Sequence, residues 1–115
     1  MKGLWSIVLV VAALVAAAPA WAHKAPNLQT PREAELNLLR SPGILGKWQP
    51  SFIDSKTKLP RANIVVQCVG VGHEVSSTFH QLDCTVTLAP WRARIRYVAL
   101  GRYGFIAQHV RVARS

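Results

Sequence analysis

The sequence has little of what most enzymes need. Only 5 of its 115 residues are acidic and they are scattered, so a hydrolase that pairs two carboxylates is not expected. It contains no Gly-x-Ser-x-Gly segment, which excludes the nucleophile elbow of an α/β-hydrolase, and no Cys-x-x-Cys redox motif. A stretch of 115 residues is also too short for a TIM barrel or a two-half dinucleotide fold. We therefore expect a small non-enzymatic protein without a cofactor.

Long apolar runs are also absent, apart from one at the N-terminus. The segment 4–18 is apolar except for one serine and follows a basic residue, but it is shorter than the ~20 residues that span a bilayer. Ala-Trp-Ala at 20–22 then supplies a small-x-small cleavage site. We interpret residues 1–22 as a Sec-type signal peptide that is cleaved after Ala22 rather than after Ala20. The mature protein is then periplasmic or secreted, and not an integral membrane protein.

Export determines how the two cysteines are interpreted. In an oxidising compartment, Cys68 and Cys84 most simply form a disulfide. By the chain-entropy argument, a loop of this length contributes about 3 kcal/mol to stability. Such a contribution is large against the marginal stability of a small domain.

A helix is predicted near the start of the mature chain. Residues 23–29 are polar and contain a proline, so we expect an irregular lead there. Thr30 at the N-cap, Pro31 at the first helical position and Glu33 three residues after the cap form a capping box. These residues predict a helix that begins at Pro31.

The apolar residues of this helix predict its buried face. Leu36 and Leu39 share one face, which Ala34 and Leu38 widen, and Ser-Pro-Gly at 41–43 ends the helix. Residues 43–60 then show no hydrophobic period, so we expect an irregular crossover.

The C-terminal half is typical of a β-sheet. β-branched residues and alternation begin after Arg61, and short links predict antiparallel neighbours. We expect one α+β domain over residues 30–115, with a single N-terminal helix packed on a four-stranded antiparallel meander sheet that carries one disulfide. The four predicted strands are 64–72, 78–88, 92–100 and 105–112.

The cysteines also predict the register of the first hairpin. Pairing Cys68 with Cys84 centres this hairpin on Ser76 and gives both strands one apolar face. Gly70 and Gly72 leave one end of that face without side chains, so we expect the helix to pack closely there. The residues on the shared face are Ile64, Val66, Cys68, Gly70, Leu82, Cys84, Val86 and Leu88.

The spacing around the cysteines resembles that of a known group. The motif C-x-G-x-G at 68–72, followed by F-x4-C-x-V at 79–86, resembles a loose group of small exported, disulfide-containing bacterial proteins of unassigned function. The resemblance covers roughly residues 31–110, and Leu82 departs from it because an aromatic residue is usual at that place. It implies the same disulfide and an α+β fold, and it carries over no catalytic or binding residue.

Charge is the strongest functional signal in the sequence. Basic residues outnumber acidic ones by 14 to 5, a balance that favours anionic partners. Arg92, Arg94 and Arg96 alternate with apolar residues, so on a strand their guanidinium groups project from one face. Such groups can bind phosphate or carboxylate, which makes these three the candidate anion-binding residues. Further arginines that extend the patch are Arg102, Arg111 and Arg114.

The partner of this patch stays open at this point. An anionic polymer, a lipid headgroup or an acidic protein would each fit, whereas nucleic acid is disfavoured because the chain is exported and aromatic residues are few. The alternative is an ordinary solvated outer face of a sheet, guarded by charge against edge pairing.

Two further functions are also left open. His23 would be the first mature residue, and its amine and imidazole could chelate Cu(II) together with a second histidine, as in a periplasmic copper-binding protein. A disulfide-stapled sheet would also suit a small protein inhibitor of another exported protein. The candidates for the second histidine are His73, His80 and His109.

Overall fold

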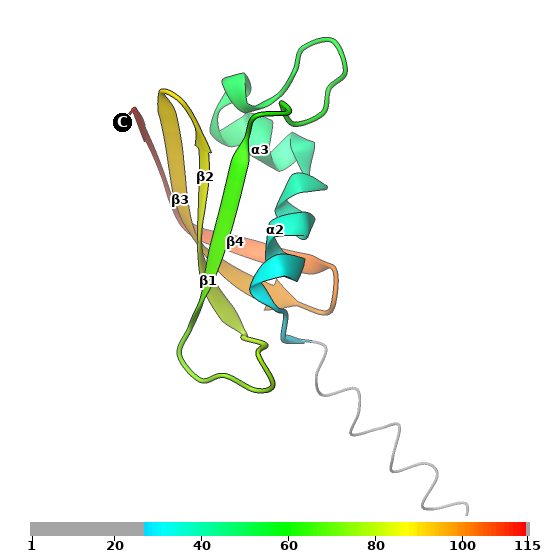
Figure 1. The fold of residues 1–115 in the computed structure, drawn as a ribbon, viewed down its shortest axis with the longest axis vertical. Helices are drawn as coiled ribbons and strands as arrows, with labels where there is room; N and C mark the ends of the chain where they lie inside the picture. Colours follow the sequence, from blue (N-terminus) through cyan, green and yellow to red (C-terminus); the bar gives the residue numbers. More distant parts are fainter. Residues whose placement is uncertain (1–26, 115) are drawn as a thin grey trace, which may run out of the picture.

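The computed structural model describes residues 27–114, so the predicted signal peptide and His23 lie outside the described residues. Two short helices, α2 (Pro31–Leu39) and α3 (Pro42–Trp48), precede a 3₁₀ turn, η2 (Pro50–Phe52). An antiparallel sheet in the order β1-β2-β3-β4 follows, and the helices lie on one side of it (Figure 1). Its strands are β1 (Val65–Val71), β2 (Gln81–Leu88), β3 (Trp91–Leu100) and β4 (Gly104–Arg114). In the range 27–114, no helix is long and apolar enough to cross a membrane.

The start of α2 confirms the predicted capping box. The Thr30 hydroxyl accepts a hydrogen bond from the Glu33 amide at 3.0 Å, and the Glu33 carboxylate accepts one from the Thr30 amide at 2.8 Å. Two backbone donors that the first helical turn leaves free are thereby satisfied. Pro31 occupies the first turn, where its missing N–H costs nothing.

The single predicted helix is wrong, because a second helix follows it. Pro42 was expected to end helical structure, but it stands at the first position of α3, where proline is also favoured. Most of the predicted irregular segment 43–60 therefore has local structure. Leu45 of α3 and Phe52 of η2 are fully buried and form a core cluster with residues of β2 and β3, namely Val86, Leu88 and Ala93.

The face that α2 buries also differs from the prediction. Ala34, Asn37 and Leu38 are buried, whereas Leu36 and Leu39 are only half-buried. These three positions follow the helical spacing i, i+3, i+4. Because Asn37, in the middle of this face, is polar, the apolar pattern of the sequence does not predict the face.

The first hairpin has the predicted register and the predicted disulfide. Cys68 lies directly opposite Cys84, and Val66 lies opposite Val86. The Cα atoms of the two cysteines are 4.1 Å apart, which is close to the separation of a non-hydrogen-bonded antiparallel pair. The backbone amide of Cys68 therefore points away from β2.

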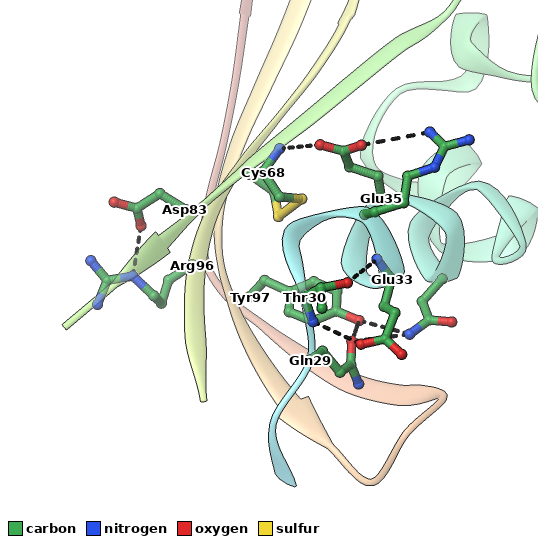
Figure 2. The surroundings of a disulfide bond; sticks show 11 residues. Gln29, Thr30, Glu33, Glu35, Cys68, Asp83, Arg96 and Tyr97 are labelled. Carbon is green, nitrogen blue, oxygen red and sulfur yellow. Dashed lines mark hydrogen bonds and ion pairs between the residues drawn. A yellow bond between two sulfur atoms is a disulfide. The ribbon is translucent and has the colours of Figure 1, made fainter. Parts of the chain in front are cut away.

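The outward-pointing amide at this edge strand finds a partner on α2. The Cys68 N–H donates to the Glu35 carboxylate at 2.9 Å, and Glu35 also lies 3.8 Å from the Arg32 guanidinium (Figure 2). A free sheet edge can pair with another chain, and covering it with a helix is a common protection. A side chain of α2 thus satisfies one outward-pointing amide of the β1 edge.

The bare end of the β1 face is filled by an aromatic ring and not by α2. A Cβ atom added to Gly70 would lie only 2.3 Å from the Phe79 ring. The predicted close packing of the helix on Gly70 and Gly72 is therefore wrong. Glycine is required at position 70 because the ring of Phe79 occupies the space of a side chain.

A buried amide network ties the chain entrance to the β3–β4 turn. The Gln29 side chain, fully buried, donates to the carbonyls of Gly101 and Gly104 at 3.1 and 2.8 Å. Its carbonyl oxygen accepts from the Asn37 amide at 3.0 Å and from the Tyr97 hydroxyl. Burial raises the pKa of Tyr97 above 10.0, although its hydrogen bonds to Asn37 and Gln29 act in the other direction.

The end of the predicted irregular lead, residues 23–29, makes defined contacts with the sheet. Gln29 pairs with Phe79 through two backbone hydrogen bonds of 3.0 and 2.8 Å. Asn27 accepts from the Gly101 amide at 3.2 Å. The last residues of the lead are therefore part of the fold, and they hold the β3–β4 turn in place.

Candidate anion-binding face

The predicted arginines lie on the face of the sheet that points away from the helices. Alternate residues of β3 (Ala93, Ile95 and Tyr97) are buried among the core residues. The intervening Arg94 is exposed, whereas Arg92 and Arg96 are half-buried. The alternation along β3 thus separates apolar core positions from basic outer positions.

Strand β4 adds one arginine to the same face. Arg111 lies directly opposite Arg94, whereas Arg114 lies opposite Trp91, on the side of the core positions, with its guanidinium 5.0 Å from the centre of the Trp91 ring. Arg102 lies instead in the turn between β3 and β4, apart from this set. We call the following set the arginine face: Arg92, Arg94, Arg96 and Arg111.

A β-bulge shapes the middle of this face. Arg94 pairs with Arg111, but Arg96 pairs with Gln108, so β4 carries one residue more than β3 between these pairs. His109, one of the two β4 residues in the bulge, has a positive φ of 53°. A bulge of this kind bends the strand and redirects side chains.

Two shallow hollows flank the Arg94–Arg111 pair. The larger one, about 490 Å³, lies at the bulge. The smaller one, about 290 Å³, lies toward the C-terminal end of β4. Arg94 and Arg111 contribute to both, so the pair stands between the two hollows. The other side chains around the larger hollow include Asp83, Thr85, Arg96 and His109, and those around the smaller one are Arg92, Ala113 and Arg114.

The arginines differ in how far their charge is already neutralised. The Arg96 guanidinium lies 2.7 Å from the Asp83 carboxylate (Figure 2). It also donates to the Gln81 side chain at 3.1 Å. Across residues 27–114, no acidic side chain forms an ion pair with Arg94 or Arg111. Of the three arginines predicted from the sequence, Arg96 is thus the least available to a ligand.

Arg92 has an unused hydrogen-bond donor. Its Nε atom is shielded from solvent and has no hydrogen-bond partner within the described part of the chain. A shielded donor without a partner costs free energy that an acceptor would recover. Arg92 borders the smaller hollow, where an anion oxygen could serve as this acceptor.

The histidines considered for copper are spread over different elements. His73 is exposed in the connection between β1 and β2, and His109 lies in the bulge of β4. His80 lies next to the chain entrance, with its Nδ1 atom 3.1 Å from the Asn27 carbonyl oxygen. Among the residues that the structure describes, no group of three or more His, Cys, Asp or Glu side chains could hold a metal ion.

Comparison with known proteins identifies no family or function for this chain. The chain matches no protein-family model, no curated protein and no solved structure. The function is therefore inferred from the residues themselves.

Proposed function

We propose that this chain is an exported, non-enzymatic protein that binds an anionic partner through the arginine face. The Cys68–Cys84 disulfide supports export, because disulfides persist in oxidising compartments outside the cytosol. The interpretation of residues 1–22 as a signal peptide gives the same location.

The observation that carries the proposal is the Arg94–Arg111 pair. Like charges directly opposite each other on neighbouring strands destabilise a sheet. Here the two guanidinium groups border two hollows, and no carboxylate of residues 27–114 forms an ion pair with either of them. Asp83, which borders the larger hollow, is paired with Arg96. A bound anion would offset this repulsion and would also satisfy the Nε donor of Arg92. A face kept basic only for solubility would not need two arginines in register.

A matched pair of variants tests this proposal. The face variant carries Arg92→Gln, Arg94→Gln and Arg111→Gln, and the control variant loses the same net charge on the helical side and the loops. Immobilised heparin, a sulfated polyanion, serves as the probe. The exposed control positions are Arg40→Gln, Lys47→Gln and Lys56→Gln.

The face variant should elute from heparin at much lower salt than the control variant, because clustered arginines release more counterions on binding than dispersed charges. Equal shifts in both variants would show that only net charge matters, and the proposal would then fail. Thermal unfolding of each variant verifies that the fold is retained.

The copper alternative has one supporting observation. His80 lies beside Asn27, and residues 23–26 can span at most ~14 Å, which brings His80 within possible reach of His23. In this second candidate function, the N-terminal amine and the two imidazoles bind Cu(II).

Copper titration of protein that begins at His23 tests this alternative. Binding of one Cu(II) that His80→Ala weakens, and that His109→Ala leaves unchanged, would support it. A His80→Ala variant that binds copper like the unmodified protein would exclude His80 as a ligand.

A further inference from the structure

The β3–β4 hairpin combines the arginine face with an apolar end. Tyr103 in the turn is 70% exposed, and Leu100 and Ile106 beside it are 43% and 46% exposed. Within residues 27–114, four of the nine exposed large hydrophobic side chains lie on this hairpin, the fourth being Val110 in the bulge. Apolar side chains gathered in this way often mark an interaction site.

The apolar end and the arginines lie on the same face of the ribbon. Ile106 is opposite Val98, and Val98 is two residues from Arg96, so all three belong to the outer face. Each two-residue step along a strand is about 6 to 7 Å. From the hairpin end, the face therefore runs from Leu100 and Ile106 through Arg96 to the Arg94–Arg111 pair.

The apolar side chains are displayed by a rigid turn. The carbonyls of Gly101 and Gly104 accept hydrogen bonds from Gln29, and the carbonyl of Arg102 accepts one from Asn37 at 3.3 Å. Beneath them the rings of Tyr97 and Phe105 stack with their centres 4.7 Å apart. The exposure of the hairpin end is thus fixed by the buried network and does not arise from a loose turn.

From this juxtaposition we infer that the β3–β4 ribbon docks on an anionic membrane surface. The side chains of Leu100, Tyr103 and Ile106 enter the interfacial layer, and the arginine face binds the anionic headgroups. This inference rests on the proposed function and names its partner.

A lipid surface fits both parts of the ribbon, whereas a polyanion in water fits only one. Tyrosine, with an apolar ring and a polar tip, is suited to the boundary between headgroups and hydrocarbon. Each basic residue near an anionic surface strengthens binding about fivefold. A soluble polyanion would use the arginines and gain nothing from Leu100 or Ile106.

The chain entrance lies at the same end of the fold. Asn27 contacts Gly101 in the turn, and only residues 23–26 separate it from the predicted cleavage site. Four residues span at most ~14 Å. With cleavage after Ala22, as proposed, the new N-terminus therefore lies within ~14 Å of Asn27, at the hairpin end of the fold.

Vesicle sedimentation with two apolar variants tests this inference. The probes are vesicles of phosphatidylcholine alone and vesicles of phosphatidylcholine mixed with anionic phosphatidylglycerol. The hairpin variant is Tyr103→Ser with Ile106→Ser. Its matched control is Val65→Ser with Val69→Ser, which removes two exposed apolar side chains from β1 on the same face of the sheet.

The unmodified protein should bind the anionic vesicles and not the neutral ones. The hairpin variant should bind anionic vesicles about tenfold more weakly, because two partly inserted side chains are lost, while its elution from heparin stays unchanged. The β1 control should match the unmodified protein in both assays. The Arg92/Arg94/Arg111 face variant should lose both activities.

The outcomes separate the two claims. Retention on heparin without binding to anionic vesicles, or vesicle binding that the hairpin variant leaves unchanged, would overturn the membrane inference and leave the proposed function standing. Equal loss in the hairpin and β1 variants would exclude insertion at the hairpin end. If the face variant still binds both vesicles and heparin, the proposed function is overturned as well.

Discussion

Replacement of Gln29 by alanine should destabilise the fold more than any surface substitution. The side chain is fully buried and makes four hydrogen bonds, two to the carbonyls of Gly101 and Gly104 and two from Asn37 and Tyr97. Each such bond contributes about 1 kcal/mol net, and partners left without a bond add to the loss. We expect Gln29→Ala to lower the free energy of unfolding by about 3 to 4 kcal/mol, a large share of the 5–15 kcal/mol typical of a domain.

Urea denaturation of the oxidised protein measures this loss through the shift of the midpoint at constant slope. Asn27→Ala is the matched control, because Asn27 is exposed and its side chain accepts one hydrogen bond from the same turn. We expect it to cost less than about 1 kcal/mol. A loss below about 1 kcal/mol for Gln29→Ala would refute the argument that the network holds the turn. In that refuted case, a double-mutant cycle of Gln29→Ala and Tyr97→Phe would also show no coupling free energy between the two side chains.

Three further predictions test separate parts of the structure. Cys68→Ala should cost about 2 to 5 kcal/mol, and unchanged urea midpoints with and without reductant would contradict a stabilising disulfide. Gly70→Ala should cost about 1 to 3 kcal/mol because the new Cβ would overlap the Phe79 ring. Gly43→Ala, in open space on α3, should instead stabilise the fold by up to about 1 kcal/mol. Similar urea midpoints for the two variants would refute the packing of Phe79 on Gly70. Because the folded-state pKa of Tyr97 is raised, the unfolded chain loses this proton first, so stability should be full below pH 10 and fall as pH rises from there through the folded-state pKa. The fall should be smaller in Tyr97→Phe, and identical alkaline profiles would contradict the raised pKa.

The sheet could be predicted because its signals are local. Alternation and short links identify four strands, and one pair of cysteines determines the register of the first hairpin. The structure has this register, with Cys68 opposite Cys84. Strand ends differ by a few residues: β1 runs from Val65 to Val71 where 64–72 was predicted.

The helical part was less predictable because its signals are ambiguous. A proline can end one helix or start another, and at Pro42 it starts α3. Asn37 stands in the buried face of α2 because Gln29 and Tyr97 satisfy its side chain. No local sequence pattern predicts such a partner, because Tyr97 lies 60 residues away in the sequence.

The residues of the arginine face could be predicted only in part from the sequence. Alternation places Arg92, Arg94 and Arg96 on one face, and the short turn at Ala89-Pro90 would have placed Asp83 opposite Arg96, as the structure has it. The pairing of Arg111 with Arg94 could not be derived in this way. It depends on the extra residue at the His109 bulge, which shifts the β4 register by one position.

Hydrogen–deuterium exchange on vesicles containing phosphatidylglycerol tests the central claim most directly, because it reports which surface binds. Amides of residues 91–114, which cover β3, the turn and β4, should become protected when the vesicles are added. Residues 31–52, which form the helical side, should exchange as they do in the free protein. Protection centred on residues 31–52, or no protection at residues 91–114, would contradict binding through the arginine face.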